Sequence, residues 1–242
     1  MSSISRRRFL QLSTLAGGMA LAGGALPTGG MLHHVLERAW GTNRAWAADA
    51  PKGDPIKIGI IDPLSSPYKT SSIHDVHGAR VAIDMYNKRG GVLGRPVALL
   101  EEVDDASNPQ TAVKAATKLI KDDGVDFLMG TFNGDVSLAV AEVARSQNRL
   151  FMVTGAHIME LTGSKCNPHT FVFMPNARMM AQAVAPHISK AYGNRWYTIT
   201  ADTVDGKAAL QAMSEAHRAQ GGEIVGGATT PFGTTDFTAA LT

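Results

Sequence analysis

The sequence is poor in cysteine and in aromatic residues, and it has no unbroken apolar run of membrane-spanning length. One cysteine in 242 residues excludes an intramolecular disulfide framework and a zinc site made of several cysteines. The chain also lacks the phosphate-loop pattern G-x-x-x-x-G-K-S/T and the nucleophile pattern G-x-S-x-G, so two large classes of enzyme find no support. The remaining composition, 44% hydrophobic and 18% charged, is typical of a folded protein with one large or two small domains.

The N-terminal 47 residues have the parts of an export signal. Residues 5–11, Ser-Arg-Arg-Arg-Phe-Leu-Gln, precede a weakly apolar stretch that glycines interrupt. Ala45-Trp46-Ala47 supplies a small-x-small site, so cleavage is predicted after Ala47. Residues 5–10 resemble the twin-arginine motif S-R-R-x-F-L, which implies the twin-arginine translocase as a partner during export. An uncleaved N-terminal anchor is the alternative.

The basic character of the chain belongs to this leader. Residues 1–47 hold five Arg and one Glu, a charge of +4, whereas the remaining 18 basic and 20 acidic residues give −2. A slightly acidic mature protein gives no support for nucleic acid as a partner.

After the leader, β-branched runs alternate with helical patterns. Strands are predicted at residues 56–61, 97–103, 125–129, 150–154, 170–174, 196–200 and 223–227. Helices are predicted at residues 73–89, 110–121, 136–147, 179–191 and 207–220, and another begins near residue 236. The alternation predicts an α/β fold whose parallel sheets are covered by helices and bind ligands at the carboxyl ends of their strands.

An ordered series of short segments carries a family resemblance that covers residues 56–242. It includes Ile56–Ile61, Ser65-Ser66-Pro67, Asn87–Arg95, Asp104-Asp105 with Asn108-Pro109, Asp123–Asp126, Met129-Gly130, Met152–Thr154 and Thr235–Thr238. This series resembles the branched-chain amino-acid-type, or Leu/Ile/Val-binding-like, periplasmic binding proteins. These proteins are the soluble receptors of ABC importers.

The resemblance implies a type I periplasmic-binding fold, with two doubly wound parallel-sheet lobes that close on a ligand. We expect an export signal at residues 1–47, an N-terminal lobe at 48–174 and part of a second lobe at 175–242. The second lobe is expected to continue past Thr242. The isolated chain would then expose apolar faces and strand edges and be poorly stable.

The main ligand loop implied by the resemblance contains Phe132, Asn133, Gly134 and Asp135. A helix N-terminus offers free backbone N–H groups and a partial positive charge, which suit a carboxylate. Gly134 stands where amino-acid binders usually have serine, and its N–H remains usable. Asp135 would repel a carboxylate unless it caps the helix expected at residue 136; a cationic ligand group is the other interpretation.

The next ligand loop implied by the resemblance contains Ala156 and His157. Histidine is an unusual polar residue there, and both a structural role and a ligand contact remain open. Tyr68 and Ser71 are expected in the loop after the first strand. Ser71 falls near a family position that often holds an aromatic lid residue, and Tyr68 either replaces that residue or packs on the loop.

In the second lobe, the corresponding loop contains Thr203 and Asp205. The family often has tyrosine before the following glycine, where this chain has Asp205. This aspartate either binds an amino group or caps the helix at 207–220; the two interpretations stay open.

Two other clusters are set aside. His74, Asp75 and His77 resemble a metal cluster, but no third ligand has a fixed sequence relation to the two histidines. Cys166 lies beside Lys165 without a recognisable base, so it is interpreted as a loop residue. No metal or cofactor is therefore expected.

The sequence thus predicts a periplasmic solute-binding protein, not an enzyme. It would capture an amino acid or a related amide, carboxylate or aromatic acid and deliver it to an ABC permease in the inner membrane. A ligand-sensing regulator with the same fold is the alternative. An exported enzyme is disfavoured, because no nucleophile–base or metal constellation is visible.

Overall fold

The computed structural model describes residues 50–241, so the predicted leader and its cleavage site lie outside the described residues. The first lobe contains β1 (Ile56–Asp62), α3 (Lys69–Lys88), β2 (Val97–Asp104), α4 (Pro109–Lys121), β3 (Phe127–Gly130), α5 (Gly134–Ser146), β4 (Leu150–Val153), the 3-10 helix η2 (Glu160–Thr162) and β5 (Thr170–Val172). The second contains α6 (Ala177–Tyr192), β6 (Arg195–Ala201), α7 (Val204–Arg218), β7 (Glu223–Thr230) and α8 (Thr238–Leu241).

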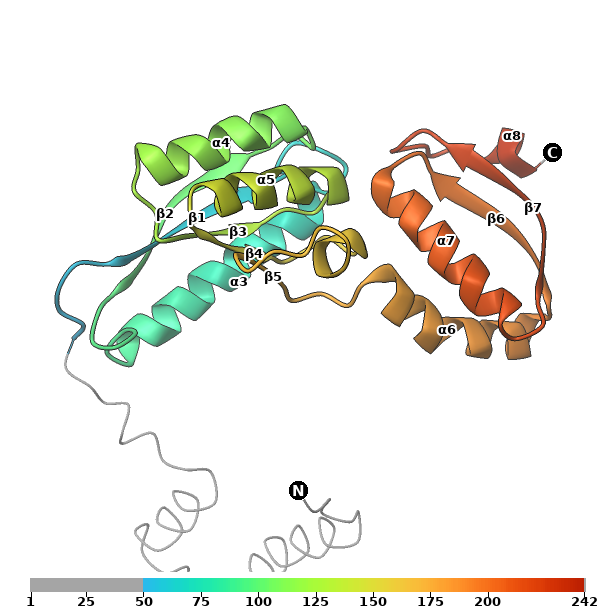
Figure 1. The fold of residues 1–242 in the computed structure, drawn as a ribbon, viewed down its shortest axis with the longest axis horizontal. Helices are drawn as coiled ribbons and strands as arrows, with labels where there is room; N and C mark the ends of the chain where they lie inside the picture. Colours follow the sequence, from blue (N-terminus) through green and yellow to red (C-terminus); the bar gives the residue numbers. More distant parts are fainter. Residues whose placement is uncertain (1–49, 242) are drawn as a thin grey trace, which may run out of the picture. The chain divides into compact units, whose positions relative to one another are not determined.

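The five strands of the first lobe form one sheet in the order β2-β1-β3-β4-β5, and every neighbouring pair is parallel. Helices α4 and α5 lie on one face and α3 on the other (Figure 1). Strand β1 serves both layers, because successive side chains point to opposite faces. Ile60 packs in a cluster with Val76 of α3, whereas Ile61 belongs to the larger cluster that includes Leu119 of α4.

The strand order fixes where a ligand can enter. From β1 the chain goes first to β2 on one side and then to β3 on the other. This reversal opens a crevice at the carboxyl ends of β1 and β3, where such sheets bind ligands. Helix α5 begins at this edge, immediately after β3.

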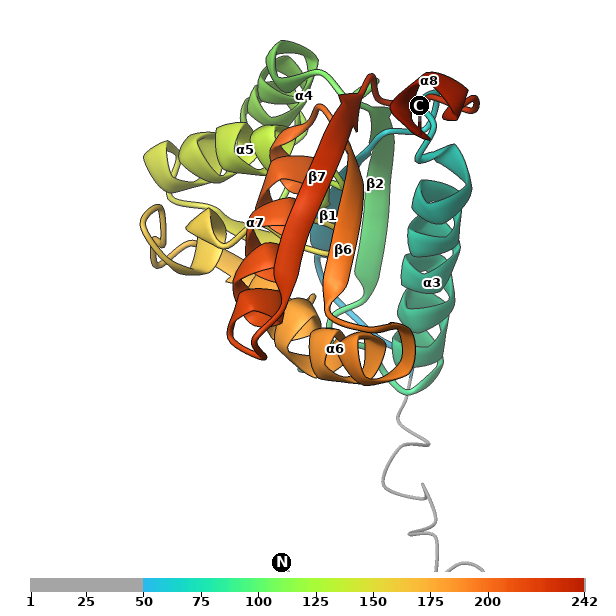
Figure 2. The same ribbon diagram turned by 90° about the vertical axis from the view of Figure 1, so that its right-hand side faces the viewer.

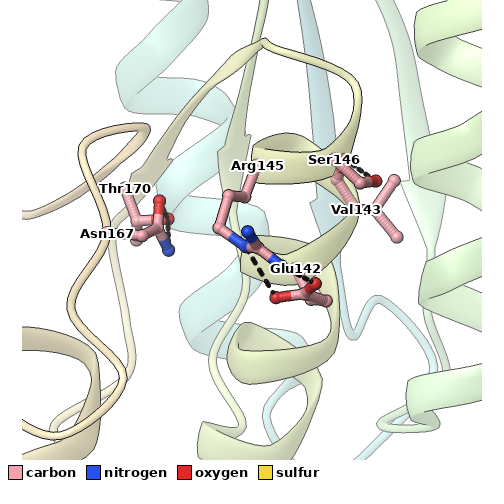
Figure 3. A network of polar contacts seen from close by, with 6 residues as sticks. All are labelled: Glu142, Val143, Arg145, Ser146, Asn167 and Thr170. Atoms are coloured by element: carbon pink, nitrogen blue, oxygen red, sulfur yellow. Dashed lines mark hydrogen bonds and ion pairs between the residues drawn. The ribbon is translucent and has the colours of Figure 1, made fainter.

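The opposite end of α5 is a solvated helix end (Figure 3). Arg145 lies in the last turn, donates from Nε to Glu142 at 3.0 Å and also pairs with it through its second nitrogen. A cation near a helix C-terminus complements the helix dipole. The loop before β5 is held by Asn167, which donates to Thr170 Oγ1 at 3.1 Å.

In the second lobe, β6 and β7 are parallel and α6 packs against α7 through small buried residues. These residues are Ala181, Ala185, Ala208 and Ala212. Figure 2 shows β6 and β7 in front of α7. Tyr197, Ile199 and Val225 are exposed on these strands, so one face of the two-stranded sheet keeps apolar side chains in contact with solvent.

A buried histidine organises the core of this lobe. His217 of α7 is fully buried and stacks on Trp196 with ring centroids 3.6 Å apart. Its Nε2 donates to the carbonyl oxygen of Asn194 at 3.0 Å, so Nδ1 accepts from the hydroxyl of Ser189 at 2.9 Å in the neutral ring. Gly222 is required beside the ring, because a Cβ there would lie 2.1 Å from His217 Cε1.

The predicted α/β fold with parallel sheets is confirmed, and the differences concern the ends of elements. Strand β7 runs to Thr230 rather than residue 227, β3 begins at Phe127 rather than residue 125, and several helices begin earlier than predicted. Helix α3 starts at Lys69 rather than Ile73 because the turn that Lys69 closes on Ser66 leads directly into the helix. Helix α5 begins two residues before the predicted position and α7 three residues before it. Between residues 50 and 241, no helix combines the length and the hydropathy that a membrane span requires.

Candidate functional site

The turn from β3 into α5 is held in a fixed shape by strand β1. Gly130 has φ +113°, and a Cβ there would lie 2.3 Å from the carbonyl oxygen of Ile61. The buried Thr131 also has a positive φ, of 63°. Its N–H donates to Ile61 O and to Asp62 Oδ1, each at 2.9 Å. These bonds stabilise a conformation that non-glycine residues rarely adopt, and they fix the start of α5.

The start of α5 has one acceptor without a donor, on the N-cap Asn133, and one backbone donor already in use, on Gly134. Asn133 is the N-cap, yet its side chain makes no capping hydrogen bond and is only 6% exposed. Its Oδ1 is buried and accepts no hydrogen bond from any residue between 50 and 241. The N–H of Gly134 donates to Asp205 Oδ2 at 2.7 Å. Position 134 also requires glycine, because a Cβ there would lie 2.4 Å from Ile158 Cγ2.

Asp205 reaches Gly134 from the first turn of α7, in the second lobe. Burial raises the pKa of Asp205, and the backbone N–H groups of Gly134 and His157 oppose that rise. The carboxylate of Asp135 raises the same pKa further. A carboxylate from one lobe therefore occupies the amide at the start of a helix of the other.

The ring of Tyr68 contacts two other aromatic rings beside this pair, each from a different loop. Tyr68 follows β1, Phe132 follows β3 and Phe232 follows β7. The ring of Tyr68 lies 5.7 Å from Phe132 and 4.8 Å from Phe232, measured between centroids. Burial raises the pKa of Tyr68, and the charges of Asp205 and Asp135 raise it further. The aromatic group and the Asp205 carboxylate thus belong to one site.

His157 ties the loop after β4 to the start of the second lobe. Its ring donates from Nδ1 to the carbonyl oxygen of Pro175 at 2.8 Å. Its own carbonyl oxygen accepts from the N–H of Ala177 at 2.7 Å. The neighbouring Ala156 is fully buried in the core. The polar side chain of His157 is therefore satisfied by the connection between the lobes.

Most of the residues predicted for the site come together. Interactions link Tyr68, Phe132, Gly134, His157 and Asp205, and Asn133 and Asp135 are neighbours of Gly134 along the chain. The prediction that Ser71 lies in the loop after β1 is wrong. Ser71 is an exposed residue in the first turn of α3.

The capping roles also differ from the sequence interpretation. Asp205 does not cap α7: Thr203 is the cap, and its hydroxyl accepts from the N–H of Gly206 at 2.9 Å. Asp135 lies in the first turn of α5 and accepts from the N–H of Val136 at 2.9 Å, which is a helix-start role.

Phe232 was missed by the sequence reasoning. A signal was present, because Pro231-Phe232-Gly233 directly follows β7, and the carboxyl ends of strands are where such folds place ligand loops. Gly233 also lies against Pro67 of the first lobe, since a Cβ added to it would be 3.6 Å from Pro67 Cγ.

A group of buried carboxyl groups lies below the site, and the sequence reasoning missed it too. Asp62 is fully buried, and its Oδ1 accepts from the Thr131 N–H. Burial, then the charge of Asp75 and that of Asp105, raise the pKa of Asp62 to about 8. Burial likewise raises the pKa of Asp105 to about 6. Asp62 is therefore largely protonated at neutral pH.

The arrangement is that of a binding site with two carboxylates, Asp135 and Asp205, and an unpaired buried oxygen on Asn133. Residues 50–241 hold no group of three or more His, Cys, Asp and Glu side chains placed to bind a metal. A hollow between α6 and α7 is lined by Arg178, Glu215 and other helix residues, and by none of the ten predicted site residues. The site is thus the edge where the two lobes contact each other.

Comparisons with known proteins agree with this architecture. The sequence model of the family described as "Periplasmic binding protein" matches residues 55–242. The Leu/Ile/Val-binding protein BraC3 of Rhizobium johnstonii is 32% identical over 191 residues, which cover 77% of this chain and 50% of that protein.

Solved structures give the same result. A solute-binding protein of an ABC transporter from R. palustris, in complex with benzoate, has a TM-score of 0.71 at 26% identity, covering 77% of this chain and 51% of that one. An amino acid ABC transporter substrate-binding protein from Pseudomonas fluorescens Pf-5 has a TM-score of 0.67 at 25% identity, covering 77% and 49%. The chain therefore spans about half the length of the relatives it matches.

Proposed function

We propose a binding function for this chain, which belongs to the periplasmic binding protein family. The protein captures a small polar ligand between two lobes and delivers it to an ABC permease in the inner membrane. The ligand is an amino acid or a related amide, carboxylate or aromatic acid. The protein releases its ligand unchanged, and closure of the lobes is the step that the permease recognises.

The observation that carries this proposal is the meeting of loops from both lobes at the carboxyl ends of their strands. Tyr68 and Gly134 of the first lobe contact Phe232 and Asp205 of the second. A ligand held between such loops contacts both lobes at once. The ligand therefore binds the closed arrangement more tightly than the open one, and this difference in affinity shifts the equilibrium towards closure.

The printed descriptions of the relatives support the ligand class. BraC3 is named for leucine, isoleucine and valine, and the R. palustris protein holds benzoate. The aromatic group of Tyr68, Phe132 and Phe232 offers an apolar wall to a side chain or ring of this size.

We also propose that residues 1–47 direct export through the twin-arginine route, with cleavage near Ala47 and a periplasmic mature protein. The lobe boundary is proposed between residues 174 and 175. Two structural features support this boundary: β5 is the last strand of the first sheet and α6 begins at Ala177.

Calorimetric titration of the protein, in the longest form that its gene encodes, tests the function. The panel is leucine, valine, leucinamide, benzoate and benzamide. At least one is expected to bind and to raise the melting temperature. Binding of none of these probes would contradict the proposed ligand class.

The variant Asn133→Ala tests the site. Asn133 makes no capping bond, so its truncation is expected to leave the melting temperature nearly unchanged. The affinity for the probe that binds is expected to fall about tenfold or more. Asn194→Ala is the matched control, because Asn194 is exposed and lies in the turn before β6. Equal affinity of Asn133→Ala and the unmodified protein would remove Asn133 from the site.

A further inference from the structure

We infer that Asp205 determines ligand specificity: it occupies the backbone amide at the start of α5, excludes ligand carboxylates from it and favours ligands that bring hydrogen-bond donors. The inference rests on the proposed function and names the ligand chemistry of the same site. It concerns this chain in particular, because an aspartate stands where the resemblance implies an aromatic residue.

The first step is occupancy of the amide. The Gly134 N–H is the helix-start donor that a ligand carboxylate would use, and Asp205 Oδ2 already accepts from it at 2.7 Å. Gly134 and Asp205 lie 71 residues apart in sequence, on different lobes. A ligand carboxylate can use this N–H only by displacing the side chain of Asp205.

The second step is charge. A ligand carboxylate that displaced Asp205 would lie close to two aspartates, Asp205 and Asp135, and like charges repel at short range. Asp135 directly follows Gly134, whose N–H bonds Asp205, so both carboxylates lie near the same amide. An ammonium, amidinium or carboxamide N–H group is attracted by the same two side chains.

The third step is the number of free acceptors. Asn133 Oδ1 and Thr154 Oγ1 are buried and have no hydrogen-bond partner among residues 50–241; the amide oxygen accepts, and the hydroxyl can both accept and donate. Asn133 follows β3 and Thr154 follows the neighbouring β4, whose backbones are joined by the 3.2 Å bond from Thr154 N–H to Gly130 O. A buried acceptor without a donor is unfavourable, so Asn133 Oδ1 favours a ligand that supplies an N–H group.

The aromatic wall defines the rest of the ligand. Tyr68 contacts Phe132 and Phe232, and the three rings offer an apolar surface beside Asp205. The ligand class that fits is a small aromatic or branched aliphatic amide or amine. The corresponding free acid, which differs only in having a carboxylate, fits less well.

Two matched probe pairs test the inference: benzamide against benzoate, and leucinamide against leucine. Affinities are measured by calorimetry at pH 7.5 for the unmodified protein and for Asp205→Ala. The unmodified protein is expected to bind each amide at least tenfold more tightly than its acid. In Asp205→Ala the affinity for each amide is expected to fall and the affinity for each acid to rise, so that the preference for the amide is lost or inverted.

Asp202→Ala is the matched control. Asp202 is exposed, lies three residues before Asp205 in the loop that precedes α7, and pairs with Lys207 at 2.8 Å. It is expected to keep the preference of the unmodified protein. Asp205→Ser serves as a second variant should the alanine protein fold poorly, and the same loss of preference is expected for it.

Hydrogen exchange at the Gly134 amide gives a readout that needs no ligand. Exchange is expected to be faster in Asp205→Ala than in the unmodified protein and unchanged in Asp202→Ala. Unchanged exchange in Asp205→Ala overturns the inference even where no probe binds, a result that separately contradicts the proposed function. Tight binding of the acids with no preference for the amides overturns the inference and leaves the proposed function intact.

Discussion

The Nδ1 of His157 donates to the carbonyl oxygen of Pro175 at 2.8 Å, and the two residues lie at the two sides of the connection between the lobes. The carbonyl oxygen of His157 accepts from Ala177, the first residue of α6. The backbone that leads into the second lobe is therefore fixed by one residue of the loop after β4.

Loss of the His157 ring is expected to destabilise this connection. His157→Ala should lower the free energy of unfolding by about 1 kcal/mol, because one hydrogen bond is lost and the Pro175 carbonyl is left without its partner. His157→Asn should lose less, since an amide N–H can replace Nδ1–H. Urea denaturation measures both, with the exposed His187→Ala as control. Equal losses in the two His157 variants would contradict the role of the ring N–H.

The stability of the protein is expected to depend on the ionisation of Asp62. Its pKa is about 8 in the folded chain and 3.8 in the reference state. Because the pKa of Asp62 is higher in the folded chain, the protonated carboxyl contributes to the free energy of unfolding, and this contribution is complete below pH 4. That contribution is lost as the pH rises towards 8, by at most about 1.4 kcal/mol per pH unit.

Asp62→Asn removes this dependence. The asparagine keeps an oxygen for the Thr131 N–H and cannot ionise beside Asp75 and Asp105. Its stability gain over the unmodified protein should grow between pH 5 and pH 7.5, reaching on the order of 3 kcal/mol in urea denaturation. The exposed Asp54→Asn serves as control. Parallel stability–pH curves for Asp62→Asn and the unmodified protein would refute the assignment.

The contact between Tyr68 and Phe232 is expected to couple the two lobes. A double-mutant cycle of Tyr68→Ala and Phe232→Ala should give a coupling energy of about 0.5–1.5 kcal/mol in the free energy of unfolding. Tyr68→Ala combined with Phe173→Ala is the control pair and should be additive, because Phe173 is 68% exposed. Additivity in both cycles would mean that the ring contact contributes nothing.

His217 is expected to stabilise the second lobe through its hydrogen bonds as well as its packing. His217→Phe keeps a ring on Trp196 but leaves the Ser189 hydroxyl without its partner and removes one of the two hydrogen bonds to the Asn194 carbonyl, which keeps that from the Glu223 N–H. Thermal and urea unfolding should show a loss of about 1–3 kcal/mol. Combination with Ser189→Ala should recover part of that loss, since the stranded hydroxyl is then absent. A phenylalanine variant as stable as the original would show that only the ring packing matters.

The alternation of strands and helices could be predicted because each element has its own local pattern. Strand β1 is a run of isoleucines, and α4 has buried residues at helical spacing after an asparagine cap. The start of α3 could not be predicted in this way. Its N-cap is Tyr68, whose side chain makes no capping bond. Ser66 and Pro67 before it are typical of a loop as well as of a helix start, so the sequence favours a loop at Ser71.

The partners of the site residues could not be predicted, because they lie far away along the chain. Asp205 bonds to Gly134 across 71 residues and His157 to Pro175 across 18. A sequence pattern shows that an aspartate near a helix start accepts N–H groups, but not which helix it serves. The buried Asp62 is a similar case, since it reads as the first residue of a loop until the sheet encloses it.

The hydrogen bond between Asp205 and Gly134 is intramolecular, so a ligand carboxylate must exceed a minimum concentration before it can displace Asp205 from the Gly134 N–H. A side chain tethered to the same molecule competes at an effective concentration on the order of millimolar, which no dilution of the protein reduces. A free carboxylate that binds the bare amide weakly is therefore outcompeted at ordinary metabolite concentrations. A ligand that leaves this amide to Asp205 and binds the neighbouring acceptors meets no such competitor, so the protein can respond to it in the presence of abundant acids.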